Sequence, residues 1–443
     1  YPVNLPGVID RSYESDIINQ KYDFISEIIE EVLLHKQRQD VFTEVVDNVL
    51  TSKIWGIPVF LGIMAFTFFL TFTVGDWLKG FLEVGIDWVS GVTESGLLAA
   101  GAGTILTSLV IDGVIGGVGT IITFLPNILI LFLCLALLED SGYMARVAYV
   151  MEGIMSKLGL SGKAFIPMLL GFGCTVPAIM ASRALENKRD RYKVMLVTPF
   201  MSCNARLTIY ILFSEMFFEK NAMLVAYSMY LIGIIVAMIV SVLLHLIDRK
   251  KSVNYLMIEL PEYKLPDSRT VAIYVWEKVK DYLGKAGTTI FLATILIWVL
   301  LNFGTQGFST DMTNSFGAII GKWMVPVLAP IGLGFWQIAV ALIAGISAKE
   351  VVVSSCAVLF GIVNASSPNG MTAFSSALQE VGFGSLNALC LMIFCLLYIP
   401  CAATLATIRK ESSWAWTGFT AIFQLAIAWI VTFGVYQIGN FLM

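Results

Sequence analysis

The sequence predicts an all-α integral membrane protein: a polytopic helical bundle with two gate regions that form an inverted repeat of re-entrant or broken helices. Of 443 residues, 57% are hydrophobic and 14% are charged, and the mean hydropathy is +0.81. These values lie outside the range of soluble domains. Apolar runs at 54–74 and 224–246 approach the roughly 20 residues that a membrane-spanning helix needs. Interrupted apolar segments at 164–182 and 335–361 predict the gates.

The composition also excludes several classes of protein. A net charge of -4 gives no sign of a nucleic-acid partner, and two histidines are too few for a histidine metal site. All seven cysteines lie in apolar segments and none forms a CxxC pair, so we expect free thiols and no tetrahedral zinc cluster. The first 50 residues lack the short apolar core of a cleavable signal peptide.

The chain divides into three parts. Residues 1–15 read as a loop, 16–53 as an amphipathic helical linker, and 54–443 as the transmembrane transport domain. We expect spanning helices at about 54–74, 118–138, 194–218, 224–246, 287–303, 386–408 and 414–441. Lys and Arg cluster at 183–193 and 248–285, which places both loops in the cytoplasm, whereas acidic 75–112 belongs on the other side. The amino terminus is then cytoplasmic.

The first gate region, about 113–218, centres on the stretch Gly171–Pro177. Gly171, Gly173 and Pro177 disfavour a continuous helix. A break at membrane depth frees backbone groups that hydrocarbon cannot satisfy, so it must be buried in protein or line a polar cavity. Segment 164–182 therefore predicts a hairpin that enters and leaves on the cytoplasmic side.

The second gate region, about 287–410, repeats the order of span, broken hairpin and span. Its hairpin, 335–361, carries Lys349 and Glu350 in the middle of an apolar segment, where charge is expensive and rarely faces lipid. We expect this hairpin to enter from the outside and Glu350 to pair with a partner such as Lys349. Inverted repeats of this kind form their substrate site where discontinuous helices meet near the midplane.

Three cysteines are candidate metal ligands: Cys174, Cys203 and Cys401 each stand beside a proline or a polar residue that opens the backbone. Thiols suit transition metals better than magnesium or calcium. Buried cysteine also packs as a small hydrophobe, and we assign that role to the other four cysteines and filler roles to the methionines. Glu350 is a fourth candidate ligand. The predicted pathway or gate residues are Gly171, Gly173, Pro177, Glu139, Asp140, Asn204, Lys349 and Pro400.

One motif misleads. Asn187–Asp190 matches the guanine-specificity pattern NKxD, but it stands in a basic loop between membrane segments, and the chain has no GxxxxGK[ST] phosphate loop. We therefore expect this chain to be a transporter without catalysis.

Several long motifs, in order, resemble the membrane portion of the FeoB family of bacterial ferrous-iron transporters. They are Leu138–Arg146, Gly171–Ala181, Leu185–Arg191, Pro199–Arg206, Ala348–Val353 and Tyr398–Cys401, and the resemblance covers about 16–443. It implies two gates like those of nucleoside transporters and a route for Fe(II) past Cys174, Cys203 and Cys401. The substrate would be Fe2+, taken up across the inner membrane into the cytoplasm.

The resemblance also implies parts that this sequence lacks. Family members carry an amino-terminal GTPase domain, for which GTP and Mg2+ are expected; no cofactor is expected in this chain. Asn4–Gly7 resembles the end of the GTPase motif DxPG without its aspartate, so we expect 1–15 to be the remnant of an upstream domain. Expected partners are the lipid bilayer, a small cytoplasmic FeoA-type protein and a second copy in a homo-oligomer.

Two alternatives stay open from the sequence. A nucleoside or other small-solute carrier would use the same gate architecture. A membrane-tethered regulatory GTPase would carry its catalytic part upstream of this chain.

Overall fold

The structure is a computed structural model, and it describes residues 55–247, 263–305, 307–308, 314–362 and 368–442, with isolated positions between 20 and 52. The chain forms two units, 1–49 and 50–443. The predicted remnant, 1–15, and most of the predicted linker, 16–53, lie outside the described residues.

The described chain is a multi-pass helical membrane protein. Five helical stretches are long and apolar enough to cross a membrane, and a bent pair, 316–331 with 336–344, would make a sixth. Large apolar side chains cover their outer faces; Phe66 and Phe69, for example, are 66% and 65% exposed. Such surfaces are costly in water but match lipid. Apart from a two-stranded ribbon, β1 (Phe303–Gly304) with β2 (Gly307–Phe308), the described elements are helical.

Helix α3 (Gly56–Ala99) is longer than the span predicted at 54–74. Its 44 residues would measure about 66 Å, twice the hydrocarbon thickness of a bilayer. The acidic residues after position 74 ended the predicted span, but charge on an exposed face does not interrupt a helix. The segment 75–99, predicted only as a non-cytoplasmic region, is therefore helical.

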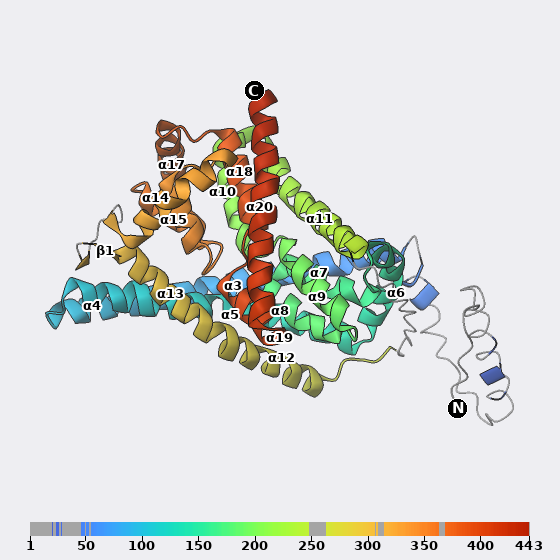
Figure 1. Cartoon of the computed structure of the whole chain (residues 1–443). Helices are drawn as coiled ribbons and strands as arrows, with labels where there is room; N and C mark the ends of the chain where they lie inside the picture. The colour runs from blue at the N-terminus through green and yellow to red at the C-terminus, as the bar shows by residue number, and fades with distance from the viewer. Residues whose placement is uncertain are drawn as a thin grey trace. The chain divides into compact units, whose positions relative to one another are not determined.

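A second long stretch lies along α3. It consists of α4 (Thr104–Ser108), a π-helical turn (Leu109–Ile115) and α5 (Gly116–Asp140), which contains the predicted span 118–138. Figure 1 shows α3 and α4–α5 side by side, running across the direction of α20 (Trp414–Leu442). Pro126 lies inside α5 and removes one backbone donor there.

The first predicted hairpin breaks where the sequence indicated. Helix α7 (Phe165–Gly173) and helix α8 (Thr175–Ala181) meet at Cys174, whose backbone is extended. Gly171 is required by packing, since a Cβ there would lie 2.9 Å from the Cβ of Met201. Pro177 falls in the first turn of α8, where no intrahelical donor is lost.

The second predicted hairpin has the same plan with a longer break. Helix α15 (Trp336–Ala344) and helix α16 (Val351–Leu359) are joined by residues 345–350. A Cβ on Gly345 would lie 2.1 Å from Val352 Cγ2, so only glycine allows the two arms to approach.

Two spans predicted as continuous are also broken. The span at 194–218 consists of α9 (Lys188–Val197), a turn of 3-10 helix (Thr198–Phe200) and α10 (Asn204–Phe218). The span at 386–408 consists of α18 (Ser385–Leu397) and α19 (Ala402–Glu411). Pro199 and Pro400 stand in the two breaks, where each prevents the backbone from continuing as helix.

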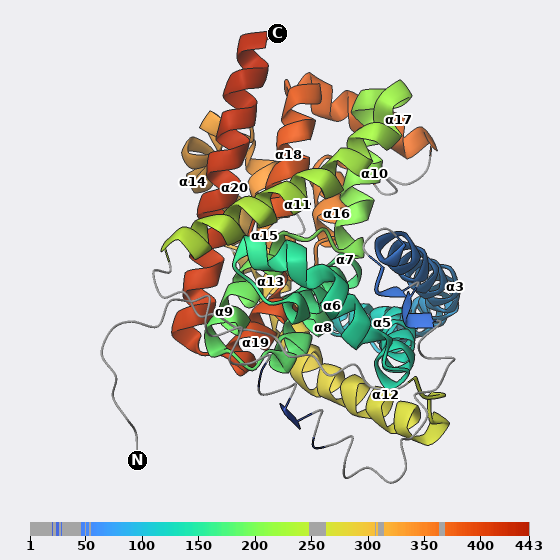
Figure 2. The same cartoon turned by 90° about the vertical axis from the view of Figure 1, so that its right-hand side faces the viewer.

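The remaining spans match their predicted ranges: α11 (Ala222–Ile247), α13 (Thr288–Asn302) and α20. Helices also occur where the sequence patterns assigned none: α6 (Tyr143–Met155), α12 (Ser268–Tyr282), α14 (Phe316–Leu328) and α17 (Pro368–Glu380). Helix α12 begins at Asp267, whose carboxylate accepts from Thr270 N at 3.0 Å, and it buries a valine face against α5. Figure 2 shows α18 beside α20; α10 and α11 pack against α18, and these helices contribute to the largest core cluster.

Candidate functional site

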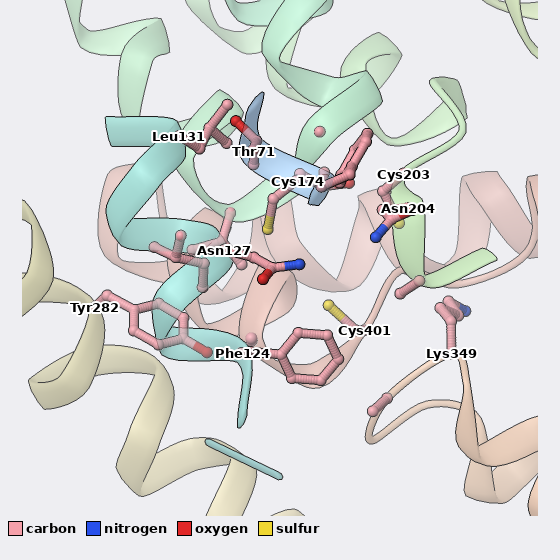
Figure 3. Close-up of a pocket in the computed structure, with 18 of the residues that line it drawn as sticks. Thr71, Phe124, Asn127, Leu131, Cys174, Cys203, Asn204, Tyr282, Lys349 and Cys401 are labelled. Carbon is pink, nitrogen blue, oxygen red and sulfur yellow. The ribbon is translucent and has the colours of Figure 1, made fainter. Parts of the chain in front are cut away.

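The four breaks converge on one cavity of about 110 Å³. It is lined by residues from both hairpins, both broken spans, α3, α5 and α12: Thr71, Phe72, Phe124, Asn127, Ile128, Leu131, Gly173, Cys174, Thr175, Val176, Cys203, Asn204, Ala205, Tyr282, Ser347, Ala348, Lys349, Cys401 and Ala403. Figure 3 shows this cavity. Segments more than 300 residues apart in sequence therefore build one site.

The three candidate cysteines all line this cavity and occupy equivalent places in their helices. Cys174 precedes α8, Cys203 precedes α10 and Cys401 precedes α19, each with extended backbone angles. Each of the three thiols therefore stands where a break ends and the next half-helix begins.

The cavity also holds polar groups. Asn204 follows Cys203, and Cys401 Sγ lies 3.2 Å from Thr404 Oγ1. Asn127, which is not among the residues predicted from the sequence, donates from Nδ2 to Asp76 Oδ1 at 2.9 Å, while its Oδ1 has no partner among the described residues. Figure 3 shows Cys174 and Cys401 with their sulfur atoms in the space that the Asn127 amide also faces. An amide directly after Pro126, inside an apolar span, was the signal that could have found it.

Lys349 and Glu350 separate in the structure. Lys349 is buried and lines the cavity, where Nζ donates to the Ile399 carbonyl and lies 3.3 Å from the centroid of the Tyr398 ring. Glu350 is half-buried at the start of α16 and does not line the cavity. Among the described residues no ion pair joins the two, so the expected Lys349–Glu350 pair is wrong: the ammonium faces the second broken span.

Glu139 and Asp140 lie elsewhere, at the carboxyl-terminal end of α5. They line a separate cavity with Lys264, Thr270 and Tyr274, and Asp140 Oδ2 accepts from Asp267 N at 2.9 Å. Burial, with the neighbouring Glu139 carboxylate, raises the pKa of Tyr274 above its ordinary value. These carboxylates therefore anchor α12. They do not line the cavity that contains Cys174, Cys203 and Cys401, which we call the thiol cavity.

The backbone-breaking candidates surround the cavity without all lining it. Gly173 lines it directly, while Gly171, Pro177 and Pro400 lie in the hairpin and the broken span that carry Cys174 and Cys401. We expect Gly171, Pro177 and Pro400 to act by fixing the positions of Cys174 and Cys401.

The cysteines form neither disulfide bonds nor a metal-binding cluster among the described residues. All seven cysteines are free, as predicted, and Cys134, Cys356, Cys390 and Cys395 are buried. Across the described ranges, no group of three or more His, Cys, Asp or Glu side chains is close enough to hold a metal ion. In the part of the chain that the structure describes, the three thiols of this cavity therefore do not form a preformed cluster of three ligands.

A second polar feature, also missed from the sequence, joins the two repeats at the end of α19. The Glu411 side chain is 3% exposed; Oε2 accepts from Arg183 Nε at 2.7 Å and from Arg191 at 2.6 Å. The hydrogen bonds that Arg183 donates to the Glu411 carboxylate raise the pKa of Arg183 above its ordinary value. We call Arg183, Arg191 and Glu411 the arginine clamp.

Comparison with known proteins adds two family models. The model described as "Nucleoside recognition" (Gate) matches 121–217 and 283–415, and the model described as "Ferrous iron transport protein B C terminus" matches 226–278. The two Gate matches cover most of both predicted repeats. No solved structure matches.

Relatives match almost the whole chain. The "Fe(2+) transporter FeoB" of Staphylococcus aureus (strain MSSA476) is 38% identical over 99% of this chain and 66% of its own length. That of Methanocaldococcus jannaschii is 38% identical over 97% and 64%. A "Fe(2+) transport protein A/Fe(2+) transporter FeoB fusion protein" of Porphyromonas gingivalis is 37% identical over 97% and 56%. The chain thus spans about two thirds of the length of the first two relatives.

Proposed function

Because the chain belongs to the FeoB family, we propose that it forms the membrane pathway through which Fe(II) enters the cytoplasm. The observation that carries this proposal is the convergence of Cys174, Cys203 and Cys401 on one cavity between the four breaks. The names of its relatives and the match to a ferrous iron transport model support iron as the cargo.

The route follows the thiols. Fe(II) is a borderline-soft cation for which sulfur competes with oxygen, whereas magnesium and calcium prefer oxygen ligands. Asn204 and Asn127 offer neutral oxygen ligands beside them. Glu350, outside the cavity, is proposed as a ligand on the approach to the second gate.

The regulation of this pathway is proposed from the family. GTP hydrolysis, with Mg2+, would couple to transport through a part of the protein other than this chain, since this sequence contains no phosphate loop. A small FeoA-type protein is a proposed partner, because one relative is named as a fusion of transport protein A with FeoB. The proposed location is the inner membrane with a cytoplasmic amino terminus, and homo-oligomers are proposed as the assembly.

The test is uptake of radioactive ferrous iron under reducing conditions by cells that express the complete encoded protein. We expect Cys174→Ser, Cys203→Ser and Cys401→Ser each to lower the initial rate at least about tenfold at matched expression, the effect expected when a metal ligand is lost. Cys390→Ala is the matched control, because Cys390 is a core residue with 0% exposure. Unchanged rates in all three serine variants would contradict the thiol route.

Competition separates the alternatives. The match to a model described as nucleoside recognition favours a nucleoside carrier as the second candidate. Inhibition of uptake by Co(II) or Mn(II), with none by uridine, supports metal transport; inhibition by uridine supports the carrier. Normal iron uptake after inactivation of an upstream phosphate loop would instead support a regulatory GTPase.

A further inference from the structure

The side chain of Lys349 lies in the wall of the cavity that Cys174, Cys203 and Cys401 line. Its side chain is buried, with 2% of its surface exposed, and its ammonium donates to the carbonyl of Ile399 beside the ring of Tyr398. Ile399 lies in the break that follows α18. Its carbonyl lies two residues beyond the last residue of α18, near the negative end of that helix's dipole, so this position attracts a cation.

The other broken span has a matching arrangement. Arg206 is 1% exposed, and its Nη1 donates to the Pro199 carbonyl at 2.9 Å and to the Met201 carbonyl at 3.0 Å. Both carbonyls lie in the break between α9 and α10. In each broken span, therefore, a buried cationic side chain occupies freed carbonyls and a cysteine begins the next half-helix.

Freed carbonyls at membrane depth require a partner. In transporters built from inverted repeats, unwound carbonyls and half-helix ends supply the binding sites of coupling cations. Here the protein's own side chains fill those positions. We propose that the Lys349 ammonium is a tethered cation that occupies a monovalent-cation site at the end of α18, in place of a dissolved ion. The Ile399 carbonyl oxygen is thereby unavailable, and the thiols and the amides of Asn127 and Asn204 are left as the open ligands of the cavity.

Joining the second hairpin to the α18–α19 break does not by itself explain why Lys349 is buried there. The second hairpin and the α18–α19 break are already joined by two other hydrogen bonds: Ala402 N donates to the Ile346 carbonyl at 2.7 Å, and Tyr398 Oη donates to the Leu342 carbonyl at 3.4 Å. The ammonium is not needed to join them. Its distinctive contribution is its charge beside a carbonyl and an aromatic face, both of which attract cations.

The test is a search for a vacated cation site. Purified Lys349→Ala protein is heated in detergent in NaCl, KCl, ethylammonium chloride or N-methylglucamine chloride at equal ionic strength. We expect Na+, K+ or ethylammonium to raise the Tm of Lys349→Ala by about 3 °C or more over N-methylglucamine, because a cation that binds only the folded state stabilises it. We expect the wild-type Tm to be equal in all four salts.

Two variants control for salt and volume. Lys163→Ala removes an ammonium that pairs with exposed Glu186, so its Tm should not depend on the cation. Lys349→Met removes the charge but fills the space, so we expect a lower Tm that no cation restores. Equal Tm values for Lys349→Ala in all four salts would overturn the proposal. The proposal would also be overturned if Lys349→Ala failed to fold in every one of the four salts, because a cation that fills the vacated site should restore the fold.

This inference depends on the fold and not on iron as cargo, because the Tm is measured without Fe(II). If the uptake experiment fails while the cation-specific Tm shift is observed, the iron route is wrong and the tethered cation stands. If the cysteine variants lose iron uptake while the Tm of Lys349→Ala is equal in all four salts, the iron route stands and the tethered cation is wrong.

Discussion

Glu411 is the residue through which the two repeats contact each other at the end of α19. Arg183 and Arg191 come from the first repeat, and Glu411 belongs to the second. A carboxylate that is 3% exposed and bound by two guanidinium groups combines a large desolvation cost with strong charge-assisted bonds. Loss of its charge would leave both arginines without their anion.

We predict that Glu411→Gln lowers stability by about 2 kcal/mol, between the values for surface and buried ion pairs, since Arg183 is 45% exposed. The measurement is the Tm of the purified protein in detergent. Glu186→Gln, which removes an ion pair whose carboxylate is 87% exposed, should change stability by less than about 1 kcal/mol. Equal Tm values for the two variants would show that the arginine clamp does not hold the repeats together.

The first hairpin depends at element scale on the absence of a side chain at Gly171. The face of α7 that carries Gly171 lies directly against the break at Thr198–Phe200, with Thr198 Cγ2 and Met201 Cβ nearest. Any added atom must push the hairpin away from α9 and α10. Cys174 and Cys203, which stand on the two sides of this contact, would separate.

We predict that Gly171→Ala destabilises the protein by about 1–2 kcal/mol, because overpacking exceeds the gain in helix propensity. It should also lower the uptake rate. Gly153→Ala in α6 is the matched control: nothing lies within 4 Å of its Cβ, so the same substitution should be neutral or stabilising by up to about 1 kcal/mol. The hairpin contact is contradicted if both variants have the same Tm and uptake.

At the scale of the whole molecule, the charge pattern predicts which loops face the cytoplasm. The basic loop that contains Glu186 is predicted to be cytoplasmic, and α17, which ends at Glu380, is predicted to be outside. We predict that a membrane-impermeant maleimide labels Glu380→Cys but not Glu186→Cys in spheroplasts, with the reverse in inverted vesicles. The parent protein measures the background from the native cysteines, all of which are buried or half-buried. Labelling of both positions from one side would contradict the inverted topology.

The sequence predicts this architecture unevenly. Apolar runs locate the spanning helices, and the stretch Gly171–Pro177 contains the first break, at Cys174, because glycine and proline act on the local backbone. The length of α3 is not predicted, because charge on an exposed face does not end a helix. Helices α12 and α14 are not predicted, because their 15 and 13 residues are fewer than the roughly 20 that mark a spanning helix. The pairing of Lys349 was predicted wrongly, since the neighbour that receives its ammonium, Ile399, is 50 residues away. The contact of Asp76 with Asn127 and the arginine clamp are not predicted from the sequence, because their partners are distant in sequence and meet only in the folded chain.

The placement of each candidate thiol on a different half-helix sets a limit on how long a cargo ion could stay. An ion held between Cys174 and Cys401 would cross-link the first hairpin to α19, so its binding energy would also hold those parts together. Tight binding would then lengthen the residence time and slow each cycle. On the proposed route, throughput is highest at intermediate affinity, which neutral amides and single thiols supply better than a closed cluster of thiolates.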